Sequence, residues 1–184
     1  RGGYKKKAMA QAWRYQTIAY RRAGVSGLCP WTPVRVTGEL DFDQDLLFKA
    51  QKAAYRPVAA YVREQHTRAF GGQRLTRTFD VFNDSTGKKE LTLRWALHHD
   101  ERKPVINEGG EVTTLGPAGY GTVKVGLSLP KVEARTRYTL RWRLYSGTNC
   151  LSSSEQAIDV FPDMAIELPT SRRVILFDPN SNFD

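Results

Sequence analysis

Cysteine and long apolar runs are both scarce in this sequence of 184 residues. Only Cys29 and Cys150 occur, which excludes a disulfide-stapled scaffold, and we expect both to be free thiols because they fall in different predicted units. No window approaches the roughly 18–20 consecutive apolar residues that a membrane-spanning helix needs. The N-terminal segment RGGYKKKAMA has no apolar stretch or cleavage pattern of a signal peptide behind its charges. The sequence therefore predicts a globular chain without a membrane partner.

Motifs of several common catalytic and cofactor sites are also missing. Residues 116–121 form a turn between predicted strands and not a phosphate loop, and the three serines at 152–154 lack a nucleophile elbow. Residues 98–101 (HHDE) offer metal ligands, but neighbours on a strand point to opposite faces and no third ligand follows at a recognisable spacing. The acids at 41, 43 and 45 lack the other ligands of a calcium loop. We predict neither a metal nor a cofactor.

Basic residues outnumber acidic ones. The chain has 28 Lys and Arg against 19 Asp and Glu, a formal charge of +9 and a pI near 9.7. Such an excess is one mark of nucleic-acid binding. The basic residues are spread along the whole chain, however, with one short run at 5–7, and many alternate with apolar residues. We therefore expect a solvated sheet face and no nucleic-acid partner.

A helix is predicted over residues 5–22. Arg21 and Arg22 lie where the helix dipole favours cations, and Gly24 can take the left-handed conformation that ends a helix. The apolar stripe recurs at spacings of three and four, at Ala8, Ala12, Tyr15 and Ala19. Residues 25–31 are nearly uncharged, which is typical of a buried strand of a parallel sheet. The strand that should precede the helix is missing, so we expect a β-α-β unit cut short.

From residue 57 to 162 the hydrophobic period is two. One face of each of four segments is mainly apolar: Leu75, Arg77, Phe79 and Val81; Leu91, Leu93, Trp95 and Leu97; Val123, Val125, Leu127 and Leu129; Tyr138, Leu140, Trp142 and Leu144. The opposite faces carry Thr76, Thr78, Thr92, Arg94, Lys124, Thr139, Arg141 and Arg143. Turn-forming clusters separate the segments. The pattern predicts about seven or eight strands of an immunoglobulin-like antiparallel β-sandwich that lacks the cysteine bridge.

Two further segments flank the predicted sandwich. Residues 46–54 follow the three acids and predict a short helix, or else an ordered crossing segment. Residues 171–179 include four consecutive apolar residues and are typical of the first strand of a further domain. We therefore expect the chain to be cut at both ends.

Two stretches resemble the (β/α)8-barrel glycoside hydrolases, specifically family 2-like relatives of β-galactosidase and β-glucuronidase. AYRRAGVSGLCPWT at 19–32 is similar to the last helix and eighth strand of such barrels. RTFDVFNDS at 77–85, followed by LTLRW at 91–95, is similar to paired strands of the sandwich domain that follows them. The resemblance implies a barrel end at 1–33, a linker at 34–56, the sandwich at 57–162, and a linker with the first strand of another domain at 163–184.

The resemblance also implies roles for two residues. Trp31 would line the subsite of the bond being cleaved, since an aromatic ring at the C-terminal ends of barrel strands offers an apolar face to a pyranose. The alternative is a rim tryptophan that covers the core. Thr32 would donate to a sugar hydroxyl or cap the following turn. The catalytic glutamates would precede residue 1, so this segment alone is expected to be inactive.

Two hypotheses of function follow. In the first, the chain is an internal fragment of a retaining glycoside hydrolase, its carbohydrate substrate bound by the parent barrel that the sandwich buttresses. In the second, it is a non-catalytic basic β-sandwich that binds an acidic polysaccharide or a protein through the face of Arg94, Arg141 and Arg143.

Overall fold

A computed structural model describes residues 2–25, 27–28, 45–99 and 104–163. This part of the chain is mainly β, as the sequence predicts, with two helices and eight strands. The elements are α1 (Gly2–Arg22), α2 (Leu46–Ala54), β1 (Val58–Val62), β2 (Arg68–Phe70), β3 (Arg74–Asn83), β4 (Lys89–His98), β5 (Asn107–Leu115), β6 (Gly119–Ser128), β7 (Thr136–Ser146) and β8 (Asn149–Phe161).

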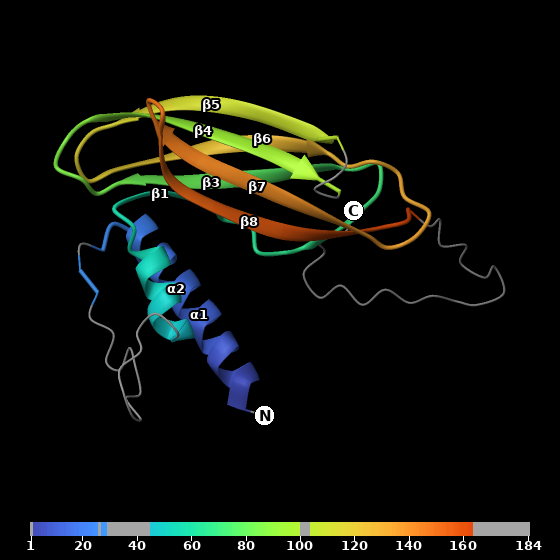
Figure 1. The fold of residues 1–184 in the computed structure, drawn as a ribbon, viewed down its shortest axis with the longest axis horizontal. Coiled ribbons are helices and arrows are strands. Elements are labelled where there is room, and N and C mark those ends of the chain that lie inside the picture. Colours follow the sequence, from blue (N-terminus) through green and yellow to red (C-terminus); the bar gives the residue numbers. More distant parts are fainter. Residues whose placement is uncertain (1, 26, 29–44, 100–103, 164–184) are drawn as a thin grey trace, which may run out of the picture.

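The strands form the two sheets of a β-sandwich. One sheet has three strands in the order β1-β3-β6, and the other has five in the order β2-β8-β7-β4-β5. All pairings are antiparallel except the short β2–β8 pair, which is parallel. Figure 1 shows the two helices together on one side of this sandwich, next to β1.

The core fills the space between the sheets with the residues that the period of two selects. Leu91, Leu93, Leu97, Leu140 and Leu144 are fully buried. The largest ring of this core belongs to Trp142, which packs edge-on against Phe79 at 5.4 Å between ring centroids and donates from Nε1 to the Ala60 carbonyl at 2.9 Å. The indole thus satisfies its polar atom while its ring excludes water. The alternation predicted from the sequence is therefore confirmed.

Arg77 is the exception on this inner face, because its side chain is charged and yet fully buried. Its Nε donates to Gln156 Oε1 at 2.9 Å and its Nη2 donates to the His66 carbonyl at 2.8 Å. Burial lowers the pKa of the guanidinium, and the negative charge of Glu64 partly opposes that shift. The hydrogen bonds explain how a charged side chain is accommodated at an otherwise apolar position.

The outer face of the three-stranded sheet is buried over β1 and over β3 from Thr78 onward, which differs from the solvated face expected there, whereas Thr76 and Lys124 are exposed as expected. Thr78 and Phe82 of β3 are both buried, and every residue of that strand from Arg77 to Asn83 is covered. The cover consists of the helices, whose side chains join the sheet in a second apolar cluster of Ile18, Ala54, Ala59, Tyr61 and Phe82. The prediction was wrong at β3 because the helices replace water on its outer side.

The expected pairing of residues 77–85 with 91–95 is also wrong. β3 pairs with β1 and β6, whereas β4 lies in the other sheet between β7 and β5. The turn after β3 is fixed by the fully buried Asn83, whose side-chain amide donates to the carbonyls of Gly87, Leu115 and Gly116. These bonds hold the turn against the end of β5 and let the chain cross to the opposite sheet.

Both predicted helices are present. α1 ends at Arg22, with Gly24 in the left-handed region at φ +76°. α2 begins after Asp45, whose carboxylate accepts a hydrogen bond from the Phe48 amide at 2.9 Å and so caps the helix. Neither helix is long and apolar enough to cross a membrane.

The predicted strand at 25–31 lies mostly outside the described residues. Val25, Gly27 and Leu28 are described and belong to no strand of either sheet. The tail from 164 onward, including the strand predicted at 171–179, also lies outside the described part of the chain.

Candidate functional site: the helix junction and a basic groove

Trp31 and Thr32, the two substrate-binding residues predicted from the sequence, lie outside the described residues, as do Cys29 and the acids at 41 and 43. The chain that leads to them is anchored at Leu28, whose carbonyl accepts a hydrogen bond from the Tyr55 hydroxyl at 3.1 Å. Tyr55 is the C-cap residue of α2. The segment before Trp31 is thus tied to the helix pair that covers the three-stranded sheet.

The C-terminal end of α1 meets the three-stranded sheet at a buried carboxylate. Asp80 is fully buried, and its Oδ1 accepts hydrogen bonds from Arg63 and from the Tyr120 hydroxyl, the latter at 2.7 Å. Its Oδ2 lies 3.4 Å from Nη1 of Arg22, the last residue of α1. One carboxylate therefore joins β3 to α1, to β6 and to the loop after β1.

The contacts of this cluster shift the pKa values of the two donors that bind Asp80. The hydrogen bond to Asp80 raises the pKa of Arg63, against the opposing effect of burial. Burial is the largest cause of the raised pKa of Tyr120, and its contact with Asp80 adds to the shift. The tyrosine therefore stays a neutral donor and the arginine stays a cation, which is the arrangement that a buried carboxylate requires.

Arg21 makes a second connection beside the first. Its Nη2 lies 2.8 Å from Asp84 Oδ2, and its Cζ lies 4.4 Å from the centroid of the Phe82 ring. Nη1 also donates to the Ala54 carbonyl at the end of α2. A guanidinium stacked on an aromatic ring and paired at its edge holds one orientation, so Arg21 fixes the rotation of α1 on the sheet. We call Arg21, Arg22, Arg63, Asp80 and Asp84 together the helix junction.

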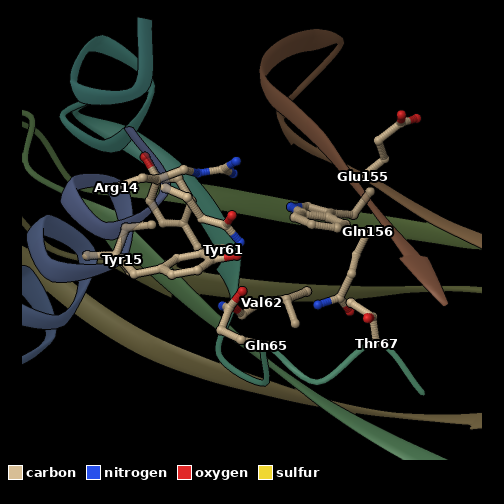
Figure 2. A pocket seen from close by; sticks show the side chains of 11 residues that line it. Arg14, Tyr15, Tyr61, Val62, Gln65, Thr67, Glu155 and Gln156 are labelled. Carbon is tan, nitrogen blue, oxygen red and sulfur yellow. Dashed lines mark hydrogen bonds between the residues drawn. The ribbon is translucent and has the colours of Figure 1, made fainter. Parts of the chain in front are cut away.

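A cavity of about 320 Å³ opens farther along α1, between the helix and the sandwich. Figure 2 shows Arg14 and Tyr15 of α1 on one side of it and Glu155 and Gln156 of β8 on the other. Arg14 spans the gap by donating from Nη2 to Ser154 Oγ at 3.2 Å, while its buried Nε has no hydrogen-bond partner among the described residues. The cavity is lined mainly by polar side chains and lies between α1 and β8.

A larger hollow, of about 650 Å³, lies on the outer face of the five-stranded sheet. We call it the basic groove, and its lining includes Arg94, Ala96, Glu108, Gly110, Arg141, Arg143 and Tyr145. The sheet register places Arg94 of β4 directly opposite Arg143 of β7, and Ala96 opposite Arg141. The three arginines named in the second hypothesis therefore share one concave surface.

Metal-binding geometry is not found among the described residues, where no three His, Cys, Asp or Glu side chains converge. His99 instead packs its ring 5.2 Å from that of Tyr138, in keeping with a structural role. Cys150 is an exposed free thiol. The acids Asp100 and Glu101 of the HHDE segment lie outside the described residues.

Comparison with known proteins gives structural likenesses and no sequence match. No protein-family model and no curated protein sequence matches the chain. A β-glucuronidase from glycoside hydrolase family 2 is similar over 57% of this chain and 11% of its own, at 10% identity and a TM-score of 0.41. A putative β-galactosidase from Bacteroides fragilis is similar over 57% of this chain and 16% of its own, at 14% identity and a TM-score of 0.40.

An enzyme of another kind shows the same degree of likeness. The alkylpurine DNA glycosylase of Pseudomonas fluorescens, bound to DNA containing an abasic site analog, is similar over 61% of this chain and 33% of its own, at 12% identity and a TM-score of 0.40. The chain spans a third or less of the length of these proteins. Likeness at this level assigns neither a family nor an activity.

Proposed function

We propose that this chain is a section of a retaining glycoside hydrolase related to β-galactosidases and β-glucuronidases, in which the β-sandwich holds the last helix of the catalytic barrel. The resemblance of residues 19–32 to the final helix and strand of such barrels is the sequence argument. In this proposal α1 is the last barrel helix, and the catalytic carboxylates are supplied upstream of residue 1.

The observation that carries the proposal is the helix junction. Arg21 and Arg22 end α1, and both are paired with carboxylates of the β3 region. Because Asp80 is fully buried, its pairing with Arg22 and Arg63 loses less to solvent screening than a surface ion pair would. A sandwich attached in this way fixes the point from which the chain runs on to Trp31.

The described carboxyl groups with shifted pKa values do not suit general acid catalysis. Asp159 has its pKa lowered to about 2 by hydrogen bonds from Arg137 and Arg135. Burial raises the pKa of Glu64, but hydrogen bonds from Thr78 outweigh it and the net shift is downward. A glycosidase acid needs a raised pKa so that it holds its proton near neutral pH. These groups support the inference that the chain contributes structure and not the catalytic pair.

In the proposed reaction the upstream barrel supplies the catalytic groups and the sandwich supports the substrate-binding strand. Two upstream carboxyl groups about 5–5.5 Å apart would act as acid and nucleophile, one protonating the leaving oxygen while the other attacks the anomeric carbon. The Trp31 ring would lie against the C–H face of the sugar, and Thr32 would donate to a hydroxyl. The sandwich would keep the strand that carries both residues in register with the barrel.

An activity assay on the full-length parent tests the proposal. We expect hydrolysis of p-nitrophenyl β-galactoside or β-glucuronide by the parent, and none by the 184-residue chain alone. Replacing the two glutamates at the ends of the fourth and seventh barrel strands by glutamine should abolish turnover. A parent that has no barrel strands with two such glutamates, or that hydrolyses neither substrate, would show that the proposal is wrong.

A further inference from the structure

The basic groove contains an uncompensated pair of like charges. Arg94 and Arg143 are direct cross-strand neighbours, so their Cβ atoms lie about 4.5–5.5 Å apart on one face of the sheet. Neither side chain has an ion-pair partner among the described residues, and Arg94 instead lies over the Tyr145 ring at 5.4 Å. Like charges in this position destabilise a sheet. An anionic group bound between the two guanidinium groups would remove that cost.

The residues around the pair leave room for such a group. Gly110 of β5 lies opposite Arg94 of β4, and Ala96 of β4 lies opposite Arg141 of β7. The groove therefore has no side chain at one of these positions and only a methyl group at the other, where larger side chains would fill the space. The resulting volume of about 650 Å³ falls within the roughly 300–1,000 Å³ of small-ligand sites. Tyr145 offers an aromatic wall beside the cations.

We propose that the basic groove binds an acidic oligosaccharide, with a carboxylate or sulfate group held between Arg94 and Arg143. Guanidinium groups bind both oxyanions through paired hydrogen bonds. Glu108 lines the same groove and would accept hydrogen bonds from neutral sugar hydroxyls. This site lies on the outer face of the five-stranded sheet, away from the helix junction, and is independent of whether the parent is a hydrolase.

The carboxylates near the arginines favour a sugar over a nucleic acid. Glu155 is paired with Arg141 at 3.1 Å, and Glu108 lies within the groove itself. A double-stranded nucleic acid presents one negative charge about every 1.7 Å and few hydrogen-bond donors along its backbone, so its phosphates would lie beside these carboxylates without a donor to offer them. An oligosaccharide with hydroxyl donors between its anionic groups matches a surface that mixes both signs.

The experiment measures binding to the 184-residue chain by fluorescence anisotropy at low ionic strength. One arm uses a labelled oligogalacturonate, which carries carboxylates, and the other a labelled heparin oligosaccharide, which also carries sulfates. A labelled cello-oligosaccharide is the neutral probe and a short DNA duplex is the competing polyanion. We expect saturable binding in at least one acidic-sugar arm, weakened by added salt, with the neutral probe and the duplex bound at least tenfold more weakly.

Two double variants with equal loss of charge locate the site. Arg94→Ala with Arg143→Ala should weaken acidic-sugar binding about 100-fold, tenfold for each charge-assisted contact. Arg68→Ala with Lys124→Ala removes the same charge from exposed positions outside the groove and should change the dissociation constant less than about twofold. Thermal melting should show both variants folded, because all four side chains are exposed.

A single charge reversal tests the same site without shortening both arginine side chains to alanine. Arg143→Glu places a carboxylate opposite Arg94, which should abolish acidic-sugar binding while leaving the chain at least as stable as the wild type. Equal weakening by the two double variants would mean attraction by diffuse charge and would overturn the proposal. Tighter binding of the duplex than of either sugar, or no binding in either acidic arm, would overturn it as well.

Discussion

Asp80→Asn is the sharpest perturbation of the helix junction. The substitution keeps the shape of the side chain and removes its charge, so the bonds from Arg63, Arg22 and Tyr120 lose their charged acceptor. Hydrogen bonds to a charged group contribute about 1.5–3 kcal/mol. The two arginine side chains are 38% exposed and can be rehydrated, which reduces the loss. We expect the free energy of unfolding to fall by about 2–3 kcal/mol.

The assay is thermal and urea unfolding of the 184-residue chain near neutral pH, followed by circular dichroism. For a chain of this size a loss of 2–3 kcal/mol corresponds to a midpoint lowered by about 5–10 °C. Asp84→Asn is the matched control, since it removes the same charge from the carboxylate that pairs with Arg21 and is 48% exposed. Its cost should stay within about 1 kcal/mol.

Hydrogen exchange and stability of the two variants, compared with each other, test whether the buried carboxylate anchors α1. Amide hydrogen exchange in the last turn of α1 should accelerate in Asp80→Asn more than in Asp84→Asn, because Arg22 loses its buried partner. Equal losses of stability in both variants, or unchanged exchange at the end of α1, would refute the reasoning that the buried carboxylate anchors the helix.

Three further predictions concern the core, acid stability and the sugar site. Phe79→Ala removes a fully buried ring packed on Trp142 and should lower the free energy of unfolding by about 3–5 kcal/mol in urea titration. Asp159 has its pKa lowered from 3.8 to about 2 by Arg137 and Arg135, so the stability it adds is present above pH 3.8 and is lost as the pH falls toward 2. Urea titrations at several pH values should show a smaller loss of stability over that interval for Asp159→Asn than for the wild type. In the full-length parent, Trp31→Ala should lower kcat/KM about tenfold, by roughly 1.4 kcal/mol of lost ring contact, with its melting temperature nearly unchanged. Unchanged kinetics would instead make Trp31 a structural residue of the rim.

The sandwich could be predicted from the sequence because the alternation of residues within each strand indicates which of its two faces is apolar. A period of two requires only that inner side chains be apolar, and the residues from Leu91 to Leu97 and from Tyr138 to Leu144 meet that condition locally. The hydrophobic period of a strand does not indicate which strands it pairs with, which is why the sequence predicts the wrong neighbour for β3. Asn83 signals a turn in the sequence, but not that its amide would fix the end of β5.

The helix junction could not be predicted in the same way, because its members lie far apart in the chain. Asp80 is 58 residues from Arg22 and 17 from Arg63, and no local spacing connects them. One signal was present: Phe82 is a large apolar residue on the face of β3 that the alternation assigns to solvent, so something had to cover it. The basic groove was easier to predict from the sequence, since the alternation already places Arg94, Arg141 and Arg143 on the outward faces of their strands.

Covalent trapping of the proposed full-length parent tests the proposed function most directly. A 2-deoxy-2-fluoro β-glycoside with a good leaving group forms a slowly hydrolysed glycosyl-enzyme in a retaining glycosidase, because the attacking carboxylate becomes glycosylated. Intact mass spectrometry of the treated parent should show the addition of one glycosyl unit, on a glutamate upstream of residue 1, and the 184-residue chain alone should remain unlabelled. A parent that acquires no label, or a label within residues 1–184, would contradict the assignment of this chain as the structural part of a glycoside hydrolase.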